Sequence, residues 1–337
     1  MCILDVKFSE DGNKIICGTK HGFIIYKLTP ELEKITSHRF NKGVGKIDHL
    51  NKTNIISFIG GGKDPYKPLN ISILWDLKTK KEFSVAEMTN PIQNVLIGFN
   101  ARITLTMDKI EILTFKADKM IGSRSTYLNP KGICSMKTTG DELDPFMTIA
   151  TLGIKKGEIA IWKPFDNFYN QIQAHLGEIS NIKLSHDNSL VATASENGTN
   201  IHVFNTITGQ LIHQLRRGTN LLANTGIHDI CISNDNSLLA CCSTNGTIHI
   251  FELNTNKDMN KNKKSLLYSV GDYLPGYFSS DWSFVQHHTG STCKMICEFG
   301  TDKANTLHVI TFEGDYFRVS GKKNEILTRK KLYVNDL

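Results

Sequence analysis

The chain has 337 residues, of which 40% are hydrophobic and 21% are charged, so its composition excludes a disordered or collagen-like protein. Lysine and arginine together number 39 and aspartate and glutamate 33, and the resulting net charge of +6 suits an anionic partner without requiring one. No apolar run reaches the roughly 20 residues of a membrane span, and Asp5 and Lys7 interrupt the apolar stretch that a signal peptide would need. We therefore expect a soluble intracellular protein.

Short β-forming runs separated by turns follow one another along the whole chain. In the clearest copies a polar turn built on Asp precedes an apolar strand, and a turn containing Gly precedes a strand that ends in an aromatic residue. Trp75 and Trp162 close two such strands, as the Trp of the Trp-Asp pair does in WD repeats. Little of the sequence has the period of an amphipathic helix, so an all-β fold is expected. In chain order, the groups of β-forming runs that repeat this pattern, here called sets, lie near residues 8–26, 44–86, 91–126, 132–174, 184–204, 232–251 and 282–335.

The spacing of these sets predicts a seven-bladed β-propeller. Ser195 and Ser243 occupy equivalent positions, 243 − 195 = 48 residues apart, and 337/7 is also about 48, within the range of a four-stranded blade. We expect a single domain over residues 1–337, with seven four-stranded antiparallel blades of the WD-repeat type. The strands near 2–8 and 327–334 are expected to complete the first and last blades without exchange between the termini.

One stretch, residues 254–276 of the sixth blade, is much longer than a turn between two strands requires. Loops of this length are usually functional or disordered. In the functional interpretation its lysines meet anionic lipid while its apolar half enters the membrane interface. The alternative is a surface loop without such a role. The residues concerned are Lys257, Lys261, Lys263, Lys264, Leu266, Leu267, Tyr268, Val270 and Tyr273.

The sequence contains no recognised catalytic constellation. It lacks the P-loop, nucleophile-elbow and His-Glu-x-x-His patterns, and the glycine-rich residues 60–63 are expected to form a hairpin connection. His287 and His288 are neighbours in a predicted strand and face opposite ways, so they cannot chelate one metal ion together. The eight cysteines include no Cys-x-x-Cys pair and are expected to be small buried hydrophobes. We expect neither an enzyme nor a bound cofactor or metal.

Two adjacent arginines, Arg216 and Arg217, stand at the exit of the fifth blade. Consecutive residues of an extended chain point to opposite sides, so the two arginines would serve two pockets, one beside each neighbouring blade. Guanidinium, hydroxyl and imidazolium groups together suit a phosphate anion, whereas the alternative is an inert, solvated basic turn. A group of Ser, Thr and His, which supplies hydroxyls and an imidazole, occurs twice near the arginines. It occurs as Ser195, Thr199 and His202 in the fifth blade and as Ser243, Thr247 and His249 in the sixth.

The segment Leu215-Arg216-Arg217-Gly218-Thr219 resembles the Phe/Leu-Arg-Arg-Gly signature of the PROPPINs, the phosphoinositide-binding β-propellers of autophagy and vacuolar membranes. The similarity covers nearly the whole chain. Leu215 stands where Phe is commoner, which favours the homologous-with-swollen-vacuole branch of the family over its core autophagy branch. Other segments that resemble the family are residues 195–204, 246–251, 277–284, 297–300 and 314–317.

The resemblance implies two sites for phosphatidylinositol 3-phosphate or the 3,5-bisphosphate, one on each side of the arginine pair. His202 replaces an Arg that is usual in the family, so the first site is expected to be weaker or more dependent on pH. The first site would comprise Ser195, Thr199, His202 and Arg216. The second would comprise Arg217, Ser243, Thr247 and His249, with Thr244 and His228 as further candidates.

The function expected from these features is recruitment to membranes without catalysis. Two anion pockets on one edge would hold the protein reversibly on vacuolar, endosomal or autophagic membranes through avidity. The resemblance implies autophagy lipid-transfer or scaffold proteins as partners, and nucleic acid is not among the expected partners. The alternative function is that of a WD-repeat scaffold that binds proteins on its flat faces, in which the arginine pair is inert.

Overall fold

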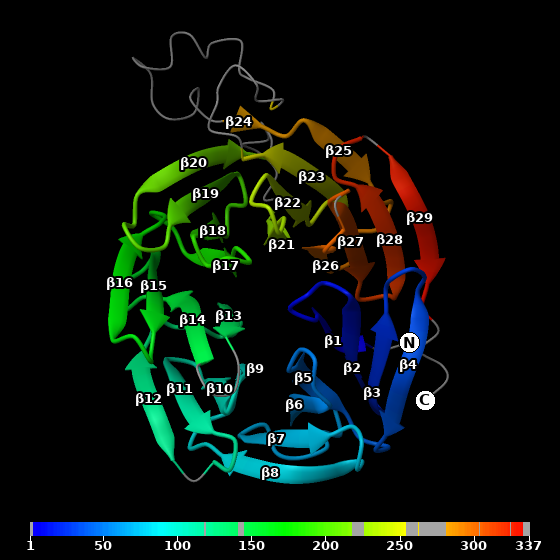
Figure 1. The fold of residues 1–337 in the computed structure, drawn as a ribbon, viewed down its shortest axis with the longest axis vertical. Coiled ribbons are helices and arrows are strands. Elements are labelled where there is room, and N and C mark those ends of the chain that lie inside the picture. The colour runs from blue at the N-terminus through cyan, green and yellow to red at the C-terminus, as the bar shows by residue number, and fades with distance from the viewer. Residues whose placement is uncertain are drawn as a thin grey trace.

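A computed structural model describes residues 3–117, 119–140, 145–217, 226–253, 262, 281–302, 304–323 and 325–332. The regular secondary structure of these residues consists of β-strands in seven sheets, which follow one another in chain order around a common axis (Figure 1). None of the described residues belongs to a helix of the length and apolarity that a membrane crossing requires.

The first four blades each consist of four consecutive antiparallel strands. Blade 1 comprises β1 (Ile3–Phe8), β2 (Lys14–Thr19), β3 (Gly22–Lys27) and β4 (Glu33–Arg39). Blade 2 comprises β5 (Val44–His49), β6 (Ile55–Gly60), β7 (Ile71–Asp76) and β8 (Lys81–Glu87). Blade 3 comprises β9 (Asn94–Gly98), β10 (Ala101–Leu105), β11 (Lys109–Thr114) and β12 (Met120–Ser125). Blade 4 comprises β13 (Cys134–Gly140), β14 (Pro145–Leu152), β15 (Glu158–Lys163) and β16 (Phe168–Gln173).

The last three blades include one crossing of the chain between sheets. Blade 5 comprises β17 (Ile179–Leu184), β18 (Leu190–Ser195), β19 (Asn200–Asn205) and β20 (Leu211–Arg216), and the short β24 (Asp281–Trp282) pairs with β20 in parallel. Blade 6 comprises β21 (Ile227–Ile232), β22 (Leu238–Ser243), β23 (Thr247–Glu252) and β25 (Val285–His288). Blade 7 comprises β26 (Met295–Phe299), β27 (Thr306–Thr311), β28 (Asp315–Ser320) and β29 (Ile326–Lys331).

The seven-bladed fold expected from the sequence is confirmed, and blades 1 and 7 are each completed by consecutive strands without exchange between the termini. The assignment of residues 282–335 to the last blade is wrong at its start. Blade 7 begins at Met295, whereas β24 extends blade 5 and β25 is the outer strand of blade 6. Residues 253–284 separate the third and fourth strands of blade 6, and because this separation is so long the fourth strand was assigned to the next sheet.

Each middle strand is buried on both faces because its sheet packs between two neighbours. All six residues of β22 are buried. Leu239 and Cys241 pack with blade 5, whereas Ala240 and Cys242 pack with blade 7. This explains why the middle strands are continuous apolar runs while outer strands such as β4 alternate with polar residues. The expectation of buried cysteines is confirmed for Cys17, Cys231, Cys241, Cys242 and Cys297, while Cys134 and Cys293 are partly exposed.

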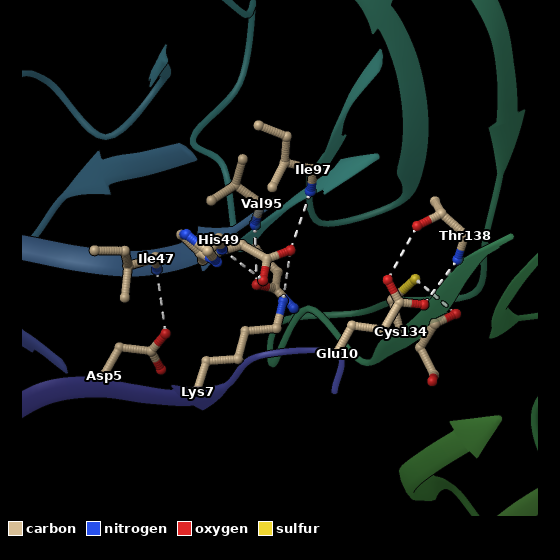
Figure 2. A network of polar contacts seen from close by, with 12 residues as sticks. Asp5, Lys7, Glu10, Ile47, His49, Val95, Ile97, Cys134 and Thr138 are labelled. Atoms are coloured by element: carbon tan, nitrogen blue, oxygen red, sulfur yellow. Dashed lines mark hydrogen bonds and ion pairs between the residues drawn. The ribbon is translucent and has the colours of Figure 1, made fainter. Parts of the chain in front are cut away.

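Side chains of the innermost strands hold neighbouring blades together by hydrogen bonds to the backbone. The Asp5 carboxylate accepts a bond of 3.3 Å from the Ile47 N–H, and the Asp48 carboxylate accepts one of 3.0 Å from the Ile97 N–H (Figure 2). Equivalent bonds join blade 4 to blade 5 and blade 6 to blade 7. In these, Leu184 N–H donates to Ser135 Oγ and Cys297 N–H donates to Asp229, both at 3.0 Å. The inner rim of the ring is therefore fixed at several points.

A cavity of about 230 Å³ lies among these innermost strands. Its charged groups largely pair with one another, as Lys7 does with Asp48 and Lys46 with Asp5, each at 3.1 Å. Burial raises the pKa of the Asp229 carboxyl to about 6 although Lys183 opposes this shift. Because opposite charges alternate around the wall, the cavity has no single-sign surface that would select an anion.

Candidate anion-binding site

The two arginines occupy opposite faces of blade 5, as strand alternation predicts. Arg216 is the last residue of β20 and pairs with Asn200 of β19, whereas the preceding residue, Leu215, packs in the core between blades 5 and 6. Alternation therefore directs Arg216 away from blade 6 and Arg217 toward it. Both arginines are buried, with 3% and 7% of their surface exposed. The alternative of a solvated basic turn therefore does not fit either residue, because β24 pairs with the end of β20 and Leu215 packs there against blade 6.

Arg216 and Arg217 have different surroundings. The Arg216 guanidinium lies 5.8 Å from the centre of the Trp282 ring, at the point where β24 joins blade 5. Arg217 Nε donates a hydrogen bond of 2.8 Å to the Gly198 carbonyl, and its charge is close enough to His249 of blade 6 to lower the pKa of that ring. Arg217 therefore belongs to the interface between blades 5 and 6.

The first candidate set gathers on the face of blade 5 that packs against blade 4. His202 pairs across the sheet with Thr193, and alternation places Ser195 on the same face. His202 Nδ1 donates a hydrogen bond of 2.8 Å to the Ala174 carbonyl, and its ring stacks on His175 with centroids 4.4 Å apart. Thr199 differs from the others, because its hydroxyl donates to the Asn197 carbonyl within the β18–β19 turn at 3.3 Å.

The second candidate set lies on the face of blade 6 that packs against blade 5. Ser243 and Thr247 flank the β22–β23 turn, and His249 follows on β23. The Ser243 hydroxyl donates to the Thr247 carbonyl at 2.9 Å, and the Thr247 hydroxyl lies 2.9 Å from His288 Nδ1. His249 Nδ1 lies 3.2 Å from the Ser283 hydroxyl. The structure thus brings Arg217 and His249 together, with the two hydroxyls bonded within blade 6.

The remaining predicted residues are less central. Thr244 follows β22, and its N–H donates to the Gly226 carbonyl at 3.0 Å. His228 lies on the innermost strand β21, where burial and the charge of Lys294 lower its pKa. Gly218, Thr219 and the predicted membrane-contact loop fall outside the described residues. The loop residues are Lys257, Lys261, Lys263, Lys264, Leu266, Leu267, Tyr268, Val270 and Tyr273.

The expectation of charged imidazoles is corrected by the structure. Burial, with smaller contributions from Arg217 and His288, lowers the pKa of His249 to about 3. Burial also lowers the pKa of His202, although its bond to Ala174 acts in the opposite direction. Both rings are therefore neutral at pH 7 in the absence of an anion. A bound phosphate would favour the charged form, because a nearby opposite charge raises the pKa of histidine.

The two imidazoles differ in the proton that each can offer. Nε2 of both rings is buried and has no hydrogen-bond partner among the described residues. The Ala174 carbonyl can only accept, so neutral His202 carries its proton on Nδ1 and must gain a second proton before Nε2 can donate to an anion. The Ser283 hydroxyl can donate to Nδ1 of His249, which leaves the Nε2 proton of the neutral ring available. The second set is therefore the better prepared for an anion at neutral pH.

Sequence reasoning missed four residues that complete these surroundings. Ala174 and His175 belong to the connection between blades 4 and 5, and Trp282 and Ser283 follow the long gap in the described chain. Each comes from outside the hairpin that it contacts. Spacing within one hairpin therefore carries no signal for them, although Trp282 and Ser283 lie in a segment noted for its resemblance to the family.

Acid is expected to destabilise the fold through these buried histidines. The pKa of His249 is about 3 in the folded protein and about 6.5 in an unfolded chain. The unfolded chain thus binds more protons between these values, and the stability present above pH 6.5 is lost as the pH falls toward 3. Thermal unfolding at pH 7.5, 6.5 and 5.5 should show a smaller loss for His249→Gln than for the wild type. Asp229, whose pKa is raised, changes the stability with pH in the opposite direction, so the variant is compared directly with the wild type. Equal changes of melting temperature with pH in the two proteins would contradict the expectation.

Comparisons with known proteins find one matching family model and several relatives of this chain, and they agree with the fold. A family model described as PROPPIN matches residues 3–273. SVP1-like protein 2 of Pichia angusta is 30% identical over 295 residues, covering 85% of this chain and 80% of the relative. Autophagy-related protein 18e of Arabidopsis thaliana is 27% identical over 322 residues, covering 94% of this chain and 83% of the relative.

Solved structures show the same architecture. Kluyveromyces lactis Hsv2 with a complete loop 6CD superposes with a TM-score of 0.74 at 22% identity, covering 98% of this chain and 99% of that one. The complex of KlAtg21 with the coiled coil of AgAtg16 gives a TM-score of 0.73 at 20% identity, covering 99% of this chain and 100% of the matched chain. At these identities the structures support the propeller fold alone.

Proposed function

The chain belongs to the PROPPIN family, and from this premise we propose that it is a non-catalytic peripheral membrane protein that binds 3-phosphorylated phosphoinositides. The observation that supports this most is the placement of Arg216 and Arg217 on opposite faces of blade 5. Near each face lies a buried imidazole whose Nε2 has no hydrogen-bond partner among the described residues. A guanidinium fork beside an imidazole suits the oxygens of a phosphate monoester.

Two pockets on one edge of the ring would make membrane binding multivalent. Each would hold one headgroup of phosphatidylinositol 3-phosphate or the 3,5-bisphosphate, and two weak sites on one surface bind more tightly than either alone. We also propose that the lysine-rich and apolar halves of residues 254–276 add a membrane contact. The expected locations are vacuolar, endosomal and autophagic membranes.

The relatives indicate a class of partner. One relative is named as an autophagy-related protein, and a structural neighbour is a complex with the coiled coil of AgAtg16. An autophagy scaffold or lipid-transfer protein is therefore the proposed partner class for this chain.

The proposed function is tested by flotation of the purified protein with liposomes. Phosphatidylcholine vesicles containing phosphatidylinositol 3-phosphate should carry the protein to the top of the gradient, and vesicles of phosphatidylcholine alone should not. Recovery on neither kind of vesicle would favour the alternative of a WD-repeat scaffold that binds only proteins. Equal recovery on both would show membrane binding that does not depend on the phosphoinositide, and would also contradict the proposal.

Titration with soluble inositol 1,3-bisphosphate is expected to give a stoichiometry near two. Arg216→Thr and Arg217→Thr should each remove one site, because the two guanidinium groups serve different faces of blade 5. At pH 7.5 the site lost with Arg217 should be the tighter one, since His249 can donate from its neutral form whereas His202 must first bind a proton. Isothermal titration calorimetry measures both the stoichiometry and the affinity. A single site in the wild type would refute the paired arrangement.

A further inference from the structure

The connection between β16 and β17, residues 174–178, carries the most exposed large apolar side chain among the described residues. Leu176 has 98% of its surface exposed. The neighbouring Gly177 is equally clear of the protein, since a Cβ built on it would meet no atom within 4 Å. The tip of this connection therefore projects from the face of the ring.

The connection is held firmly on both sides of its tip. The N–H groups of Ala174 and His175 both donate to the Gly157 carbonyl, at 2.9 and 3.0 Å. His175 Nε2 lies 3.0 Å from the Thr193 hydroxyl of blade 5, and Glu178 pairs with Lys156 at 3.7 Å. The exposure of Leu176 is thus a property of a fixed loop.

The same connection forms one side of the first candidate pocket. The Ala174 carbonyl accepts the hydrogen bond from His202, and the His175 ring stacks on the His202 ring at 4.4 Å. Leu176 directly follows these two residues. An anion bound beside His202 and Arg216 would therefore lie next to the base of the loop that carries Leu176.

The charges around the loop are compatible with an anionic bilayer. Glu178 is paired with Lys156, and Glu196 is paired with Lys131 at 2.7 Å. Lys155, which lines the same small hollow as Glu178 and Glu196, is exposed. Glu158 lines the same hollow, so the three lysines are balanced by three glutamates and the loop carries no net negative charge that would repel anionic lipid.

Isolated exposed leucines are common on protein surfaces and usually need no explanation. Leu176 differs because a rigid loop presents it beside the candidate headgroup pocket. We propose that Leu176 is a membrane anchor, which enters the boundary between headgroups and acyl chains when the first pocket holds a phosphoinositide. This inference rests on the proposed function and adds a contact independent of residues 254–276.

The test compares binding to membranes with binding to the headgroup alone. Leu176→Asp should weaken binding to liposomes containing phosphatidylinositol 3-phosphate by about tenfold or more, because one leucine side chain is no longer transferred out of water. Titration with soluble inositol 1,3-bisphosphate should be unchanged. Leu69→Asp is the matched control, since Leu69 is 46% exposed in the β6–β7 connection on the same face of the ring but in blade 2. It should leave both measurements unchanged.

Insertion itself is measured with Leu176→Trp. Fluorescence of this variant should be quenched by lipids brominated in their acyl chains more strongly than fluorescence of the wild type. Unchanged liposome affinity of Leu176→Asp, or no added quenching of Leu176→Trp, would overturn the anchor while the headgroup titration still supports the proposed function. If wild-type protein binds neither the headgroup nor the liposomes, the proposed function fails and the anchor fails with it.

Discussion

Replacing Arg216 and Arg217 together with Thr is expected to weaken binding to phosphoinositide liposomes by at least about a hundredfold. Each arginine would donate charge-assisted hydrogen bonds to a phosphate, and the loss of such a bond costs about 1.5–3 kcal/mol. Flotation and headgroup titration of the double variant measure the effect. Retained flotation would contradict the assignment of the pair to the anion sites.

The fold of the double variant must be checked because both arginines are buried. Circular dichroism and a thermal melt should show an intact β-propeller, since Arg216 ends β20, Arg217 follows it, and neither belongs to the apolar cluster between blades 5 and 6. A second variant, with Lys at both positions, keeps the charge but loses the planar fork. It should bind with an affinity between those of the wild type and the Thr variant. The difference from the wild type then measures the contribution of the guanidinium geometry, and the difference from the Thr variant measures that of the charge.

Substitution of Arg102 by Met is expected to cause the largest loss of stability. Arg102 lies on β10 with no exposed surface, and burial lowers its pKa to about 10. Its guanidinium donates to the Ser72 carbonyl of blade 2 at 3.0 Å, to the Phe115 carbonyl at 2.8 Å and to the Ser84 hydroxyl. Methionine fills part of the space but leaves these acceptors without a donor. Because each unsatisfied buried group costs about 1–3 kcal/mol, a total loss of about 3–5 kcal/mol follows.

Chemical denaturation of the Arg102→Met variant measures this loss. The matched control is Arg39→Met, because Arg39 is exposed and its bond of 2.6 Å to Asn41 lies at the surface. The control should change the free energy of unfolding by no more than about 0.5 kcal/mol. Equal effects of the two substitutions would show that the bonds of Arg102 between blades 2 and 3 contribute little.

The parts of the fold that follow from local pattern were predictable from the sequence. Turn residues at a regular spacing indicated seven blades, and strand alternation placed Arg216 and Arg217 on opposite faces. The outer strand of blade 6 was misassigned because a long segment separates β23 from β25, and local pattern carries no information across such a distance.

Contacts between blades could not be predicted from spacing within one blade. The neutral state of His202 depends on burial beneath Ala174 and His175, which come from the preceding connection. Arg102 is a similar case, since a single arginine in a short strand is usually taken as exposed. Its partners Ser72 and Ser84 lie about 20 to 30 residues earlier in the chain.

The completion of blades 1 and 7 from their own sequences has a consequence for how the ring stays closed. Every other pair of neighbouring blades is joined by a direct chain connection, so a blade that separates from its neighbour remains at a high effective concentration and packs again quickly. Blades 1 and 7 are connected only through the rest of the ring. Their contact depends on packing of Ile3 and Val6 with Ile310 and Tyr316, and on a surface ion pair between Lys330 and Glu31 at 3.1 Å. Brief opening of the ring is therefore least opposed at this seam, where no peptide linker limits the separation of the two blades.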